Sequence, residues 1–576
     1  MNAVSGKQDR FRTALWALLR YGLLGIAVAL ICTASFATPI KAWELDEVTI
    51  AQLQEGMQSG KYTARSLTEM YLTRIQQIDG KGPTLKSVLE VNPDALAIAD
   101  QLDKERREGK VRGPMHGIPV LIKDNIDTAD KMNTTAGSFA LLGVPVYKDA
   151  FLVQKLREVG AIILGKTNMS EWAYFRSTRG CSGWSARGGQ CLNPYILTRN
   201  PCGSSSGSGA AIAANLAAVS VGTETDGSIT CPSSANSLVG IKPTLGLVSR
   251  SGIVPIAHSQ DTAGPMARTV ADAATFLGAM TGVDPQDSET AKSRGIALKD
   301  YTKFLDPNGL RGARIGIARN FFGYHEKIDQ LINQCIEVMK QQGAIIIDPA
   351  NIETAGKFGD TEFEVLLYEF KADMAKYLAT RGPGPKSLKD LIEFNNAHRT
   401  LEMPYFEQEV FVMADQKGPL TDEAYLKALQ KNHQISRAEG IDATLKKYHL
   451  DAIIAPTGGP MCLIDLVIGD KLIPPLGSPK WSPSVPAVAG YPHITVPAGY
   501  IFGIPVGISL KAGPPGPAFC AFVRCTMSPT KQAASEYSPF LPPSLIRKKS
   551  RFKVPAVWPA YLYRIRSKGK RMQNDS

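Results

Sequence analysis

Apolar positions alternate between two kinds of spacing along the second half of the chain, and this alternation predicts strands followed by helices. Short isoleucine-rich runs occupy residues 314–319, 344–349 and 451–456, and each has the length of a buried strand. Residues 327–343, between the first two runs, place apolar side chains at helical spacing and end on a glycine. Strands that alternate with helices in this way predict an α/β fold with a mostly parallel or mixed sheet.

Two more apolar runs precede and follow a serine- and glycine-rich stretch in the first half. Residues 118–122, IPVLI, are typical of a buried strand that ends at Lys123. Residues 210–222, AAIAANLAAVSVG, predict a buried helix.

The N-terminal end has a different pattern. Residues 1–42 begin with a basic stretch and continue with an apolar run, residues 21–32, and a small-residue cleavage site at residues 35–37. This layout is typical of a secretory signal peptide and predicts a protein of the secretory pathway or the extracellular space. Residues 21–40 carry no charge, so the alternative is an N-terminal membrane anchor.

The C-terminal end gives no regular pattern. Residues 511–546 contain Pro-Pro and Gly-Pro steps and no helical period, and residues 547–576 are rich in Lys and Arg. We therefore divide the chain into a signal peptide or anchor over residues 1–42, a globular domain over residues 43–510, and a divergent, proline-containing basic tail over residues 511–576.

Composition and charge narrow the function. The formal net charge is +12, but the surplus belongs to the two ends, so nucleic-acid binding by the globular part is not indicated. A hydrophobic content of 44% over 576 residues is enough to bury a large core. Nine cysteines leave at least one thiol unpaired, and their spacing does not fit a zinc site. Four of them could pair in an oxidising compartment: Cys181, Cys191, Cys202 and Cys231.

The segment from residue 203 to Ser228 carries the candidate chemistry. It is dense in glycine, serine and alanine, so its backbone N–H groups can approach a substrate closely. Together with Lys123 it offers two serines, Ser204 and Ser228, and a lysine. Amide hydrolysis needs a nucleophile, a proton acceptor and an oxyanion cradle, and these residues can supply all three.

Other interpretations of the same residues remain open from the residues alone. The small residues could form a packing seam, and Lys123 could be a strand-end lysine paired with Asp124 or Asp127. Residues 203–207 match the G-x-S-x-G elbow of α/β-hydrolases. That elbow requires a strand directly before it, and the preceding segment here contains two prolines.

The motifs around these residues resemble the amidase signature family. GPMHGIPVLIKDNIDT lies before the segment, GTETDGSI lies at its end, and KPTLGLVSRSGIVPIAHSQDTAGPMARTV follows it. The resemblance covers residues 43–510 and is closest to the GTETDGSI subgroup, which includes peptide amidases and plant amidases. It implies a three-layer α/β/α fold around a large mixed sheet, with no metal and no organic cofactor.

The family's Ser–cis-Ser–Lys triad carries over residue by residue. Ser228 matches the nucleophile, Ser204 the cis serine and Lys123 the base. The resemblance also implies an oxyanion hole made by four backbone N–H groups, those of Thr225, Asp226, Gly227 and Ser228. Many members have glycine at the position of Asp226, so the aspartate narrows the pocket or adds charge. Because burial disfavours a charged lysine, we predict an alkaline activity optimum.

The implied function is a serine amidohydrolase that cleaves a linear carboxamide through an acyl-enzyme on Ser228. Its partner is then a small-molecule or peptide amide substrate, with membrane association through the N-terminus if the anchor is retained. One alternative is a protein similar to the glutamyl-tRNA amidotransferase subunits, although these usually read TGGSI where this chain reads TDGSI. Another is a catalytically dead amidase-like binding protein. Residues 362–412, rich in aromatic and Met residues, are the candidate wall of the acyl pocket.

Overall fold

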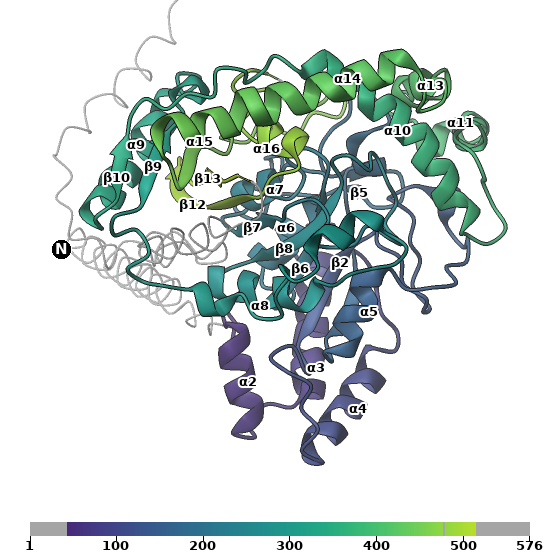
Figure 1. Cartoon of the computed structure of the whole chain (residues 1–576). Helices are drawn as coiled ribbons and strands as arrows, with labels where there is room; N and C mark the ends of the chain where they lie inside the picture. The colour runs from purple at the N-terminus through teal and green to yellow at the C-terminus, as the bar shows by residue number, and fades with distance from the viewer. Residues whose placement is uncertain (1–42, 476–477, 514–576) are drawn as a thin grey trace, which may run out of the picture. The chain divides into compact units, whose positions relative to one another are not determined.

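An eleven-stranded sheet runs through the part of the chain that the computed structural model describes, residues 43–475 and 478–513 (Figure 1). In spatial order the strands are β1 (Val88–Val91), β3 (Ile162–Thr167), β2 (Pro119–Lys123), β6 (Val219–Glu224), β8 (Thr262–Ala267), β7 (Val239–Lys242), β12 (His493–Ile501), β13 (Ile504–Lys511), β11 (Ala452–Pro456), β9 (Arg314–Ile317) and β10 (Ile345–Ile347). β2 pairs in parallel with β3 and β6, and β9 pairs in parallel with β10 and β11. The other neighbours are antiparallel, so the predicted mixed sheet is confirmed.

Helices flank this sheet, as the α/β prediction requires. In Figure 1, α2, α3 and α4 lie along the lower edge, whereas α9, α14 and α15 cross the upper part. The helices are α2 (Ile50–Gln58), α3 (Ala64–Ile75), α4 (Ala95–Arg107), α5 (Phe151–Glu158), α6 (Ser206–Ala213), α7 (Thr230–Ala235), α8 (Val270–Met280), α9 (Glu326–Gln341), α10 (Gly359–Ala379), α11 (Leu388–Ala397), α12 (Arg399–Glu402), α13 (Glu409–Asp415), α14 (Glu423–His433), α15 (Asp442–Tyr448) and α16 (Ser484–Ala489). A separate two-stranded sheet pairs β4 (Trp184–Ser185) with β5 (Gly189–Gln190).

Local sequence explains several of these elements. The three isoleucine-rich runs form β9, β10 and β11, and the IPVLI run forms β2. Helix α9 buries Ile328, Ile332, Ile336 and Met339, which lie on one face because their spacing follows the helical turn. Helix α2 begins at a capping box, in which Thr49 accepts a hydrogen bond from the Gln52 backbone N–H.

One predicted element is wrong in part. The run over residues 210–222 is not a single helix, because α6 ends at Ala213 and β6 begins at Val219. Asn215 adopts a left-handed backbone with φ of 57°, a conformation that asparagine tolerates better than most residues. The β-branched residues Val219 and Val221 then favour a strand.

The predicted leader or anchor over residues 1–42, including the apolar residues 21–40, lies outside the described residues, and so does the predicted tail from residue 514 onward. Among the helices of residues 43–475 and 478–513, none has the length and apolar character that crossing a membrane requires.

Candidate active site

Two adjacent parallel strands bring the candidate catalytic residues together. β2 and β6 pair with Val120 opposite Val219 and Ile122 opposite Val221. Because the strands are parallel, both end at the same edge of the sheet. Lys123 is the last residue of β2, and its neighbour at that edge is Thr223 of β6, whose Oγ1 accepts a hydrogen bond of 2.8 Å from Lys123 Nζ.

Lys123 is enclosed by oxygen acceptors. Its Nζ donates to Ser204 Oγ at 2.8 Å and to the Thr223 carbonyl oxygen at 3.2 Å, in addition to Thr223 Oγ1. The side chain is fully buried, and burial lowers the pKa of Lys123 to about 7, while Asp261 and Glu224 raise it in part. The lysine is therefore neutral in an appreciable fraction of molecules at neutral pH.

The ion pairs that were the alternative for Lys123 do not form. Asp124 accepts hydrogen bonds from Thr135 and from the Gly137 backbone N–H. Asp127 instead pairs with Arg381 at 3.3 Å. Within the described residues neither aspartate pairs with Lys123, so the interpretation as a strand-end ion pair is wrong.

Ser204 sits at an unusual peptide bond. The Gly203–Ser204 bond is cis although Ser204 is not proline, and the segment continues directly into α6. The Ser204 carbonyl oxygen accepts a hydrogen bond from the Ser170 N–H at 3.0 Å. No strand of the described chain lies directly before Gly203, so the G-x-S-x-G elbow is wrong as well.

Ser228 lies in a turn between β6 and α7. The left-handed residue of this turn is Gly227, with φ of 76°, where a Cβ atom would lie 2.9 Å from Trp481 Cζ2. The Ser205 N–H donates to the Ser228 carbonyl oxygen at 3.2 Å, which joins the two serine segments. Within the described residues the Ser228 hydroxyl has no hydrogen-bond partner, and the N–H groups of Asp226, Gly227 and Ser228 have no acceptor.

Glu224 fixes the other side of the turn. Its Oε2 accepts hydrogen bonds from the Ile229 N–H at 2.7 Å and the Thr230 N–H at 2.9 Å. These two N–H groups belong to the beginning of α7, where carboxylate acceptors are favourable. The carboxylate therefore ties the last residue of β6 to the helix that follows Ser228.

A cavity of about 450 Å³ opens against this edge of the sheet. Thr223 and Thr225 belong to its lining, and Asn125, also in the lining, donates to Thr223 Oγ1 at 3.0 Å. Apolar residues Ile253 and Val254 form part of its wall. Of the predicted aromatic wall, Tyr377 of α10 lines the cavity, whereas other members, such as Phe370 and Met374, lie in the buried core.

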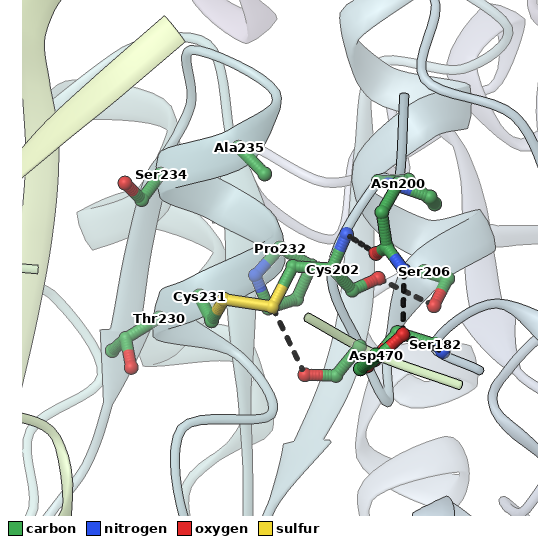
Figure 2. The surroundings of a disulfide bond; sticks show 12 residues. Ser182, Asn200, Cys202, Ser206, Thr230, Cys231, Pro232, Ser234, Ala235 and Asp470 are labelled. Carbon is green, nitrogen blue, oxygen red and sulfur yellow. Dashed lines mark hydrogen bonds between the residues drawn. A yellow bond between two sulfur atoms is a disulfide. The ribbon is translucent and has the colours of Figure 1, made fainter. Parts of the chain in front are cut away.

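A disulfide lies beside the two serine segments. Cys202 and Cys231 are bonded, as Figure 2 shows, whereas Cys181 and Cys191 are buried free thiols. Two of the four cysteines that the sequence suggested for pairing are therefore paired with each other.

Comparison with known proteins identifies this arrangement. A sequence model of the family described as Amidase matches residues 66–516. The chain belongs to the amidase family. A probable amidase of Arabidopsis thaliana is 43% identical over 500 residues, which cover 84% of this chain and 91% of the relative.

Solved structures agree with this assignment. The native peptide amidase from Stenotrophomonas maltophilia is 46% identical, with a TM-score of 0.80, over 85% of this chain and 98% of that chain. A glutamyl-tRNA(Gln) amidotransferase subunit of Pseudomonas syringae pv. tomato is 32% identical over 477 residues, which cover 81% of this chain and 94% of the relative. The chain is thus an amide-hydrolysing enzyme with the α/β amidase fold.

Several residues near the site of this amidase were not foreseen from its sequence. Asp226, half-buried, accepts hydrogen bonds from Ser484 Oγ at 2.5 Å and from Trp481 Nε1 at 3.4 Å. Burial and the neighbouring Asp226 raise the pKa of Glu362 well above its usual value. Gln260 Nε2 donates both to Glu362 Oε1 at 3.0 Å and to the Thr225 carbonyl oxygen at 3.3 Å. No sequence spacing could reveal these contacts, because the partners are far apart in the chain.

The amidase also has one group of metal-ligand residue types within its described part, His258, Glu369 and Asp373. His258 Nδ1 lies 2.7 Å from Asp373 Oδ2. Glu369 accepts hydrogen bonds from the Tyr425 hydroxyl and the Ser259 N–H. Because these groups satisfy one another, the cluster is explained as a hydrogen-bond network at the cavity rim, and we assign no metal to it.

Proposed function

We propose that this amidase hydrolyses a linear carboxamide through an acyl-enzyme on Ser228, with Ser204 and Lys123 moving the proton. The observation that carries the proposal is the 2.8 Å hydrogen bond from Lys123 Nζ to Ser204 Oγ inside a fully buried site. With a pKa of about 7, Lys123 can accept a proton at neutral pH, as a general base must.

The reaction follows from these contacts. Ser228 Oγ attacks the amide carbon while its proton passes to Ser204, whose own proton passes to Lys123. The negative oxygen of the tetrahedral intermediate is stabilised by the backbone N–H groups of residues 225–228. The C–N bond then breaks as the proton returns along the same path to the leaving ammonia or amine. Water attacks the acyl-enzyme by the same relay, which releases the acid and restores Ser228.

The comparisons favour a peptide amide as substrate. The structure that is 46% identical is named a peptide amidase, whereas the amidotransferase relative is 32% identical. The apolar cavity wall at Ile253 and Val254 suits the side chain of an apolar residue next to the scissile amide.

The test is ammonia release by the full chain from a panel of peptide amides, fatty acylamides, auxin-type amides and glutamine. Ser228→Ala should lower turnover at least about 10⁴-fold. The control is Ser220→Ala, which removes a buried hydroxyl of β6 that bonds to the Ser208 carbonyl oxygen and should retain activity.

Turnover that persists in the Ser228→Ala protein would overturn the proposed mechanism. A folded wild-type protein that cleaves no amide would favour the catalytically dead binding protein. Preference for glutamine over all other amides would favour the amidotransferase alternative.

A further inference from the structure

The disulfide cross-links the two segments that carry the candidate catalytic serines. Cys202 precedes Ser204 by two positions, and Cys231 follows Ser228 by three positions in the first turn of α7. Both cysteines are 1% exposed. Figure 2 shows the bridge running directly from the loop before α6 to α7.

Each end of the bridge is anchored to its own segment. On one side, the Cys202 N–H donates to Asn200 Oδ1 at 2.7 Å and the Cys202 carbonyl oxygen accepts from Ser206 Oγ at 2.6 Å. On the other side, the Cys231 N–H donates to the Gly227 carbonyl oxygen at 2.7 Å. A displacement of either sulfur is therefore transmitted to the backbone that holds a serine.

Across the gap between the segments, the non-covalent links are few and weak by comparison. The Ser205 N–H donates to the Ser228 carbonyl oxygen at 3.2 Å, and Asn236 Nδ2 donates to the Pro201 carbonyl oxygen at 3.0 Å. Each such bond contributes a modest net stabilisation. The disulfide provides the covalent constraint on this separation.

The packing around the sulfurs gives a second route to the site. Cys202 and Cys231 share a buried apolar cluster with Trp481. Trp481 also lies against Gly227 and donates to Asp226. Two thiols need more room than one disulfide because non-bonded sulfur atoms cannot approach to bonding distance. Reduction would therefore press Trp481 toward the turn that ends at Ser228.

We propose that the Cys202–Cys231 disulfide positions Ser204 relative to Ser228, so that full amidase turnover requires the oxidised protein. This inference rests on the proposed roles of the two serines. Proton transfer between hydroxyls requires hydrogen-bonding distance, and a displacement of about 1 Å at a reacting centre can lower the rate about 100-fold. Reduction by a dithiol breaks the S–S bond, adds two electrons and two protons to form two thiols, and converts the dithiol to its own disulfide.

The experiment measures kcat and KM of the full-length protein before and after reduction under native conditions, with alkylation and mass measurement to count thiols. We expect kcat to fall about 10- to 100-fold on reduction, KM to change less than about twofold, and oxidised glutathione to restore kcat. Far-UV circular dichroism should stay unchanged.

Variants provide the matched arm. Cys202→Ala combined with Cys231→Ala should lower kcat to the same extent and make it insensitive to reductant. Cys191→Ala combined with Cys335→Ala, which removes two free thiols, should behave as wild type in both redox states. If the first double variant fails to fold, the reduction arm decides.

Unchanged kcat in a protein shown to carry two additional thiols would overturn the inference. Loss of activity together with loss of the dichroism signal would also overturn it, because the bridge would then serve stability and not positioning. Either result leaves the proposed function intact as long as the oxidised protein is active and Ser228→Ala is not.

Discussion

At the scale of single residues, the environment of Lys123 sets the pH dependence of the enzyme. Burial stabilises the neutral amine, and the three acceptors around Nζ leave it facing Ser204. The alkaline optimum predicted from the sequence becomes more specific, because the pKa of about 7 places the rise in activity near neutrality.

We therefore expect kcat/KM to increase with pH through an apparent pKa near 7 and to level off above it, because the neutral lysine is the active form. The measurement is kcat/KM between about pH 5.5 and 9.5 in buffers of constant ionic strength. His258 lines the cavity and its pKa is raised, with the Asp373 hydrogen bond opposing the effect of burial. His258→Asn should keep the acidic limb, and a flat profile between pH 6 and 9 would contradict the role of Lys123.

Gly227 provides a second test at this scale. Gly227→Ala should lower kcat about 100-fold, because the new Cβ would meet Trp481 Cζ2 and displace the turn that holds Ser228. The matched control is Gly60→Ala. Gly60 has the same φ of 76° but nothing within 4 Å of the added Cβ, so it shares only the cost of the left-handed backbone, about 1–2 kcal/mol. Equal activities of the two variants would show that the turn does not depend on this contact.

Sequence and structure contribute differently to the site. The three residues Lys123, Ser204 and Ser228 could be selected from motifs, because each lies in a long stretch with a recognisable pattern. The side chains that hold the turn, Ser484 and Trp481, carry no such signal, since their role depends on a tertiary contact with Asp226.

At the scale of elements, a row of basic residues crosses three neighbouring strands. Lys242 of β7 pairs with His493 of β12, which pairs with Lys511 of β13. Directly paired residues point to the same face of a sheet, and all three are fully buried. Lys511 Nζ has no hydrogen-bond acceptor among the described residues, and burial lowers the pKa of Lys511 to about 7.

This row predicts a pH-dependent gain in stability when Lys511 is made apolar. The unfolded chain holds the lysine proton up to a pKa of about 10.4, whereas the folded protein releases it near pH 7. The free energy of unfolding of the wild type therefore rises with pH between those values. Lys511→Met should stabilise the protein by about 2–4 kcal/mol at pH 7 and below, with the gain vanishing toward pH 10.

Urea denaturation at about pH 6.5 and 9.5 measures the difference. Lys376→Met, at a side chain that is 72% exposed, is the control and should show no such dependence. A destabilised Lys511→Met protein at both pH values would mean that the ammonium contributes through Phe321, whose ring centre lies 5.3 Å from Nζ.

The elements themselves were partly predictable. β9, β10, β11 and α9 follow from local apolar spacing, because each is formed by one continuous run. The change from α6 to β6 was not predicted, since alanine-rich residues on both sides of Asn215 fit a helix equally well. Strand order could not be predicted either, because hydrogen bonding between strands far apart in sequence leaves no local pattern.

At the scale of the whole molecule, the predicted leader over residues 1–42 and the disulfide concern the same question. Disulfides persist in oxidising compartments, and the sequence predicts export to such a compartment. The leader, the domain limits and the basic tail stay predictions, and the family match over residues 66–516 is compatible with those limits.

The order of strands has a consequence for how this enzyme is made. β12 and β13, near the end of the described chain, lie between β7 and β11 and join the two halves of the sheet. Trp481 and Ser484, which hold the turn before Ser228, are also synthesised late. A growing chain that has already released both serines and the lysine from the ribosome therefore still lacks the middle of its sheet and the support of its nucleophile. Truncated products of translation, however long, should remain inactive until the last two strands emerge.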